Sequence, residues 1–190
     1  MTVWMLELEW FKSEDASTSS WVSKVGNFEG TGTGSGLKIE IAEGHGAQKK
    51  VKFLKGDTGD HFDFGAILPR GKYSICSVSR YTGGQNGNTG VTYYGEWNTA
   101  STRHQGEEDW VVLCGTSNKQ VYDGRDPSTN IARKSGKEFE NDEHLYVNRG
   151  HGEWSAFGVM EVITWNRELT EQEIQSTIKY LKSKLENGSQ

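Results

Sequence analysis

Apolar residues occupy every second position in several short stretches of the chain. The pattern is clearest from Trp4 to Trp10 and from Leu37 to Ile41. Successive side chains of a β-strand point to opposite faces, so this period predicts strands with one buried face. Further strands are predicted at Val51–Phe53, His61–Phe64, Lys72–Tyr81, Val91–Tyr94, Trp110–Cys114, Gln120–Tyr122, His144–Val147 and Phe157–Trp165.

Two of these stretches carry apolar residues at odd and even positions alike. In the first, Tyr73 and Ile75 alternate with Cys76 and Val78. The second is Phe157–Trp165. A strand that is apolar on both faces lies between two packed layers, so both are predicted to be central strands.

Polar and glycine-rich segments separate the predicted strands. Lys12–Ser20 is interpreted as a loop, and Gly30–Gly36 (GTGTGSG) as a flexible turn between strands. The pair Asn86–Gly87 predicts a hairpin turn, because both residues tolerate a positive φ.

One helix is predicted, over about 170–186. Thr170 and Glu173 have the spacing of a capping box, and Leu169 and Ile174 stand in the staple positions on either side of it. The apolar residues that follow recur at helical spacing on one narrow stripe. They are Ile174, Ile178, Leu181 and Leu185.

Length and charge limit the classes of protein that fit. A chain of 190 residues suits one domain, taken here as 1–190. The net charge of −5, without a basic stripe, argues against a nucleic-acid partner. No run approaches 18 apolar residues, so membrane insertion is not expected. The first residues lack the basic and apolar regions of a signal peptide, so we expect none in this chain.

The two cysteines, Cys76 and Cys114, each lie in an apolar strand-like run. Two cysteines are too few for a disulfide scaffold. The pattern favours two buried free thiols, and a single disulfide between strands is the alternative.

The segment Glu161–Ile174 closely resembles the closing strand and helix of laminin G-like modules in the concanavalin A-like lectin/glucanase superfamily. Weaker resemblances to that group lie at Trp21–Gly26, Phe62–Gly65, Ser77–Gly84 and Asp109–Val112. The resemblance implies an all-β, antiparallel, two-sheet jelly-roll sandwich with a short C-terminal α-helix. It also implies a ligand-binding protein that is extracellular or surface-associated.

Members of this superfamily include lectins, adhesion modules, glycosidases and lyases, so the fold does not settle the function. In the relatives a longer segment stands where only Gln85–Asn88 intervene here, which puts a binding loop in doubt. Retaining glycosidases need two carboxylates about 5 Å apart, and no strand of this sequence offers such a pair. We therefore expect a non-catalytic recognition module for carbohydrate or adhesion, and no enzyme. The alternatives are a structural protein of a larger surface, appendage or virion assembly, with another protein as partner, and a divergent glycan-active hydrolase or lyase.

A carbohydrate site needs an aromatic platform and a few fixed polar groups on a loop surface. Two segments offer them, although for Tyr93 or Tyr94, and for Trp154, the sequence favours a place in the core over a place in a binding site. The predicted ligand-binding residues are Arg80, Tyr81, Tyr94 and Trp97 in the first segment, and Arg149, His151 and Trp154 in the second.

Aspartates near predicted loops could hold calcium, which prefers carboxylate and carbonyl oxygens. The candidate ligands are Asp57, Asp60, Asp63, Asp123 and Asp126. The expected cofactor is therefore none, or one structural Ca²⁺. The histidines are scattered without cysteine partners at zinc spacing, so a transition-metal site is not expected.

Overall fold

The structure is a computed structural model that describes residues 9–83, 108–118, 120–132, 140–149 and 155–189, with the backbone alone at 93–94 and 97–98. Its strands are β1 (Glu9–Lys12), β2 (Ser20–Val22), β3 (Glu29–Thr33), β4 (Lys38–Gly44), β5 (Ala47–Gly56), β6 (His61–Asp63), β7 (Ser74–Tyr81), β8 (Tyr93–Tyr94), β9 (Trp97–Asn98), β10 (Val111–Thr116), β11 (Gln120–Asp123), β12 (Tyr146–Val147) and β13 (Phe157–Trp165). A 3₁₀ turn, η1 (Ser13–Asp15), follows β1, and helix α2 (Glu171–Asn187) follows β13.

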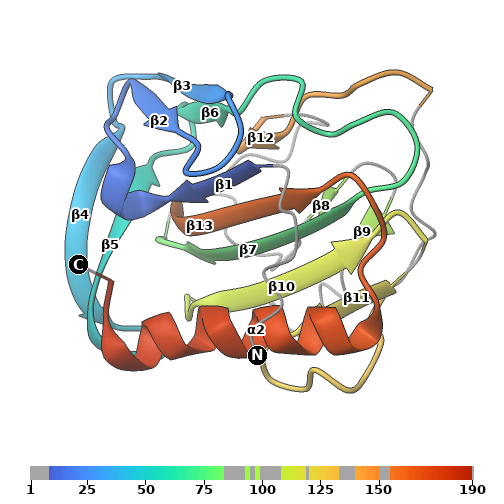
Figure 1. The fold of residues 1–190 in the computed structure, drawn as a ribbon. Helices are drawn as coiled ribbons and strands as arrows, with labels where there is room; N and C mark the ends of the chain where they lie inside the picture. Colours follow the sequence, from blue (N-terminus) through green and yellow to red (C-terminus); the bar gives the residue numbers. More distant parts are fainter. Residues whose placement is uncertain are drawn as a thin grey trace.

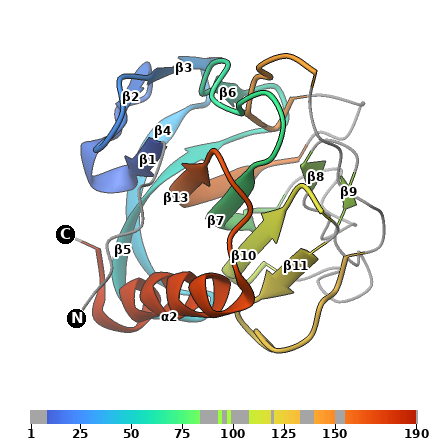
Figure 2. The same ribbon diagram turned by 45° about the vertical axis from the view of Figure 1, so that its right-hand side comes forward.

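The strands form two antiparallel sheets, and α2 lies against the larger one (Figures 1 and 2). The large sheet has the order β11-β10-β7-β13-β5-β4, with β1 paired to β13. The small sheet has the order β12-β6-β3-β2, and β8 and β9 form a separate hairpin. The all-β sandwich with a short C-terminal helix is thereby confirmed.

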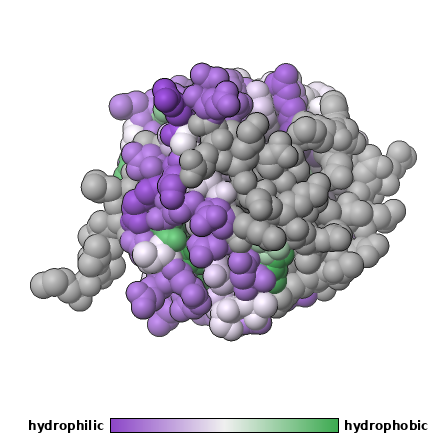
Figure 3. All heavy atoms as spheres, turned by 90° about the vertical axis from the view of Figure 1, so that its right-hand side faces the viewer, coloured by the Kyte–Doolittle hydropathy of each residue, from purple (hydrophilic) through white to green (hydrophobic). Residues whose placement is uncertain are grey.

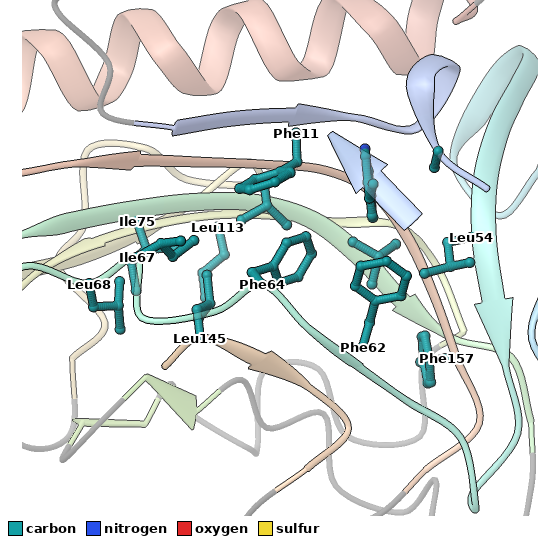
Figure 4. Packing of buried hydrophobic residues seen from close by; sticks show 14 of the residues in the cluster. Phe11, Leu54, Phe62, Phe64, Ile67, Leu68, Ile75, Leu113, Leu145 and Phe157 are labelled. Carbon is teal, nitrogen blue, oxygen red and sulfur yellow. The ribbon is translucent and has the colours of Figure 1, made fainter. Parts of the chain in front are cut away.

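The inner core fills the space between the two sheets (Figure 4). Trp21 and Phe62 come from the small sheet, and Phe11, Ile75 and Leu113 from the large one. The aromatic rings meet edge-on or tilted, as at Trp21 and Phe62, whose ring centroids are 5.8 Å apart. Such geometry adds about 0.5–1.5 kcal/mol per pair to the area that the rings bury.

A second core lies between the large sheet and α2. Cys76 and Val78 of β7 face this core, whereas Tyr73 and Ile75 face the inner one. This alternation confirms the prediction that the strand is central. The apolar residues of α2 that were predicted from helical spacing all lie in the second core: Ile174, Ile178, Leu181 and Leu185.

The start of α2 confirms the predicted capping box. Thr170 Oγ1 accepts from the backbone amide of Glu173, and the Glu173 carboxylate accepts from the backbone amide of Thr170 at 2.8 Å. Arg167 donates two hydrogen bonds to the same carboxylate, from Nη1 to Oε2 and from Nη2 to Oε1, both at 2.8 Å. The pKa of Glu173 is lowered to about 2, chiefly by these hydrogen bonds from Arg167.

The interpretation of Gly30–Gly36 as a flexible turn is wrong for its first half, which belongs to strand β3. A Cβ on Gly30 would lie 2.5 Å from a Phe62 ring carbon, and one on Gly32 would lie 2.0 Å from a backbone oxygen. The glycines let the strand pass directly over buried rings. The predicted loop at Lys12–Ser20 likewise contains η1.

The prediction of two free thiols is also wrong. Cys76 and Cys114 are joined by a disulfide. The two residues are directly opposite each other in the pairing of β7 with β10, so the register of that pair decides the bond.

A buried charge network ties α2 to the large sheet. Glu161 is 0% exposed and accepts from Trp10 Nε1, from Tyr180 Oη at 3.0 Å and from Lys184 Nζ at 2.7 Å. Lys184 Nζ also donates to Glu14 at 2.8 Å. A register shift in β13 immediately precedes Glu161, and such bulges re-aim side chains.

No helix in the described part of the chain is long and apolar enough to cross a membrane. The first half of the predicted strand at Trp4–Trp10 lies outside the described residues.

Candidate functional site

The outer face of the small sheet carries a stack of planar side chains. Tyr146 lies on β12, the edge strand, and is paired with Asp63 of β6. The rings of His144 and Tyr146 stack with centroids 5.5 Å apart and planes 20° apart. The guanidinium carbon of Arg149 lies 5.0 Å from the Tyr146 ring centroid. We call His144, Tyr146 and Arg149 the Tyr146 platform.

Strand alternation explains why the platform faces outward. Val147 packs against the inner core, so Tyr146, its neighbour, takes the opposite face. His144 is two residues before Tyr146 and shares that face. The His144 side chain is 48% exposed, which leaves it open to a ligand.

Asp63 fixes the orientation of His144. Its carboxylate oxygens lie 3.0 and 3.2 Å from Nδ1 of the imidazole, and Oδ1 also accepts from the Gly65 amide at 2.8 Å. An ionised carboxylate only accepts hydrogen bonds, so Nδ1 carries the proton and Nε2 remains for another partner. The ring is held as a polar and planar contact surface.

Asn148 shapes the turn that presents Arg149. Its φ is +58°, and its Nδ2 donates to the carbonyls of Asp57 at 3.2 Å and Asp60 at 2.8 Å. Its Oδ1 accepts from the Ser155 amide at 2.7 Å. Asn148 therefore joins two distant segments at the residue before Arg149.

The predicted calcium ligands bind donors of the protein itself. Asp60 accepts from the amides of Gly36 and Asp57, at 3.1 and 2.7 Å. Asp123 accepts from the amides of Arg125 and Asp126.

Asp126 accepts from Ser128, and Asp63 holds His144. In the described ranges no group of three or more His, Cys, Asp or Glu side chains could hold a metal ion. Calcium at these five aspartates therefore stays a prediction.

The structure separates the predicted pair Arg80 and Tyr81. They are consecutive residues of β7, so their side chains take opposite faces of the large sheet. The Arg80 guanidinium lies over the rings of Phe53 and Trp110, 5.6 and 5.4 Å from their centroids. Burial lowers the pKa of Arg80, against an upward effect of Glu108.

Four other predicted ligand-binding residues lie partly or wholly outside the described residues. Tyr94 and Trp97 are paired across the β8–β9 hairpin, and only their backbone is described. His151 and Trp154 lie outside the described residues. Of the second predicted segment, Arg149 alone is seen to join a cluster.

Sequence reasoning missed most of the platform. His144 and Tyr146 were assigned to a strand without a function, and Asp63 was assigned to calcium. The one signal for them is their period of two on an edge strand, which places them on one face. Their pairing with Asp63, 81 residues away from His144, is a tertiary contact.

The platform suits a sugar. Pyranose and furanose rings present flat C–H surfaces that stack on aromatic faces, and hydroxyls that bond to fixed polar groups. On the face that Figure 3 presents, the described surface is mostly hydrophilic.

No family model matches the chain, and no curated protein does. Solved structures do match it. A Trypanosoma rangeli sialidase bound to 2,3-difluorosialic acid matches with a TM-score of 0.64 and 14% identity, over 98% of this chain and 35% of the sialidase. The same sialidase with sialic acid gives 0.62 and 14%, over 98% and 35%.

Domain 4 of AbnA, a GH43 extracellular arabinanase from Geobacillus stearothermophilus, also matches, in a complex with arabinotriose. Its TM-score is 0.61 at 14% identity, over 90% of this chain and 97% of that domain. At such identities the likeness shows the fold. The chain spans about a third of the length of the sialidases.

These comparisons correct two expectations. The sialidases are enzymes that act on glycans, and they stand first among the matching structures. The expectation of a non-catalytic recognition module with no enzyme role is therefore contradicted.

Proposed function

We propose that this chain is the glycan-contacting β-sandwich of a glycan-active protein, and that it holds glycan at the Tyr146 platform. The observation that carries the proposal is the stack of exposed His144, half-buried Tyr146 and exposed Arg149, with the imidazole oriented by Asp63. Aromatic faces and preset polar groups are the two elements that sugar recognition requires.

Three further observations support the proposal. The arabinanase domain, which is covered almost fully by this chain, is itself described in complex with arabinotriose. The sialidase that matches is described in complex with sialic acid. The resemblance of Glu161–Ile174 to laminin G-like modules fits the same group of sandwiches. It also leads us to expect a location outside the cell or at its surface.

A glycan array probed with the purified chain, with and without calcium, tests the proposal. We expect binding to at least one glycan, which falls when Arg149→Ala removes the guanidinium. Lys179→Ala, which removes an exposed cation on α2, the helix that lies against the other sheet, is the matched control and leaves binding unchanged.

Absence of binding to every glycan in both conditions overturns the proposal. A requirement for calcium would revive the metal site near Asp60, and equal binding in the two conditions would dismiss it.

A further inference from the structure

The Tyr146 platform stands at one end of a row of residues that crosses the whole small sheet. Tyr146 of β12 is paired with Asp63 of β6, and Asp63 with Thr31 of β3. Thr31 is paired in turn with Ser20 of β2. Neighbouring strands are about 4.8 Å apart, so the row extends over roughly 14 Å.

Strand alternation places the far half of the row on the same outer face as the platform. Gly30, the neighbour of Thr31, faces the Phe62 ring in the inner core. Trp21, the neighbour of Ser20, is buried in the same core. The side chains of Thr31 and Ser20 therefore point outward. In Figure 1 the small sheet lies at the top, on the side of the molecule opposite α2.

Thr31 offers a hydroxyl at the middle of this face. Its side chain is exposed, and within the described ranges its hydroxyl forms no hydrogen bond. A hydroxyl both donates and accepts, as the hydroxyls of a sugar do. Threonine is β-branched and stiff at χ1, so the group loses little freedom when it binds a ligand.

Ser20 and Glu29 form a pair of preset polar groups at the far end of the row. Ser20 Oγ donates to Oε1 of Glu29, which is exposed. The backbone amide of Ser20 donates to Ser17 Oγ at 2.9 Å, which fixes the turn before β2. Because the hydroxyl proton of Ser20 is used within the protein, both groups are left to accept hydrogen bonds from a ligand.

Val22 supplies apolar surface beside these polar groups. It is paired with Glu29 on the edge strand β2, and it is 53% exposed. Like Ser20, it is on the outer face, two residues along the strand. The far end of the row therefore combines an apolar contact with fixed polar groups, as the Tyr146 platform does.

Charge is distributed unevenly along the face. Arg149 is exposed at the platform, whereas Glu29 is exposed at the far end. Lys24, two residues after Val22, is already paired with Asp15 at 3.5 Å. A ligand carboxylate is therefore attracted at Arg149 and repelled at Glu29, so the far end suits neutral sugar units.

We propose that the platform continues into a second binding surface, the Thr31 track, formed by Thr31, Ser20, Glu29 and Val22. The ligand is then an extended glycan that lies across the strands, with neutral units on the track and any acidic unit at Arg149. This inference rests on the proposed function and adds the class of glycan. A single sugar ring is much shorter than roughly 14 Å, so contact with both ends requires an oligosaccharide of about three units or more.

The dependence of affinity on chain length tests the track. The probes for calorimetric titration are arabino-, cello- and malto-oligosaccharides of two to six units, together with 3′-sialyllactose and the longer sialyllacto-N-tetraose. We expect at least one series to bind. Its affinity should rise about tenfold or more from the shortest to the longest member, because only long members reach Val22.

Two variants remove contacts of the track alone. Thr31→Val removes the hydroxyl and keeps a β-branched side chain, and Val22→Ser removes exposed apolar surface. Each should weaken the longest member about threefold and leave the shortest member that binds at its wild-type affinity.

Thr129→Val and Ile41→Ser are the matched controls, because both residues are exposed and both lie outside the small sheet. They should leave every affinity unchanged. All four substituted side chains are on the surface, and the thermal midpoint of each variant checks that it is folded.

Tyr146→Ala separates the two proposals, because it should weaken short and long members alike. Equal affinity along every series that binds overturns the track, and so does wild-type affinity of the longest member in both Thr31→Val and Val22→Ser. If Tyr146→Ala still weakens binding in either case, the proposed function stands without the track. Failure of every series to bind overturns both.

Discussion

Lys184 sits between two carboxylates, those of Glu161 and Glu14, and its side chain is 12% exposed. Burial alone would lower the pKa of Lys184, but the attraction of Glu161 and its hydrogen bond to Glu14 outweigh it, so the net shift is upward. The ammonium group of Lys184 forms an ion pair with each of the two carboxylates. Removing one member leaves a buried charge without compensation.

Replacing Lys184 by methionine should therefore lower the free energy of unfolding by about 3–5 kcal/mol. Urea unfolding followed by tryptophan fluorescence measures the change. Lys179→Met is the matched control, because Lys179 is exposed on the same helix and should cost less than about 0.5 kcal/mol. Equal stability of the two variants would show that the network contributes nothing.

The ion pair of Arg167 and Glu173 makes stability depend on pH at the acidic end. The folded pKa of Glu173, about 2, lies below its ordinary value of 4.5, chiefly because Arg167 hydrogen-bonds the carboxylate. A depressed folded pKa gives stability that is complete above the unfolded pKa. That stability is lost as the pH falls from 4.5 towards about 2.

Glu173→Gln removes this titration and keeps a capping-box residue at the third helical position. At pH 7 it should cost about 1 kcal/mol, because the pair is partly exposed and solvent screens it. The loss of stability on acidification from pH 4.5 to 2 should be smaller in the variant than in the wild type. Parallel pH profiles from chemical unfolding would contradict this assignment.

At the scale of elements, the sequence predicts best where one local signal decides. The bounds of β13 follow from a run with apolar residues at odd and even positions, and α2 begins at its capping box, as predicted. Strand β3 could not be predicted in this way. A glycine-rich composition is typical of a turn, and the sequence was therefore interpreted as one. In the structure the glycines belong to a strand that has no room for a Cβ above the Phe62 ring. That packing is known only once the small sheet is formed.

The disulfide is a further case in which pairing between elements decides. Each cysteine was placed in the correct strand, but the register of β7 with β10 places Cys76 opposite Cys114. The bond closes a loop with a sequence separation of 38 residues, and loop closure of that length stabilises by roughly 4 kcal/mol.

The double variant Cys76→Ala with Cys114→Ala should unfold at a lower denaturant concentration than the wild type. Its free energy of unfolding should be lower by most of the roughly 4 kcal/mol that the disulfide contributes. Wild-type protein treated with a reductant under unfolding conditions should match it. A wild-type chain whose stability is insensitive to reductant would argue that the cysteines are not bonded.

At the scale of the whole molecule, the two sheets and the helix form three layers with two cores, and the Tyr146 platform lies on the outer face of the small sheet. The sequence predicted the layers and one residue of the platform, Arg149. It could not predict the rest, because His144 and Asp63 come from segments 81 residues apart that meet only when β12 pairs with β6.

The affinity of Tyr146→Ala for the glycan that the wild type binds best on the array is the most direct test of the central claim. We predict a loss of about tenfold or more, because the variant removes the ring on which the sugar stacks. Tyr146→Phe keeps the ring and should bind within about threefold of the wild type. Equal affinity of wild type and Tyr146→Ala, with both correctly folded, would contradict the account.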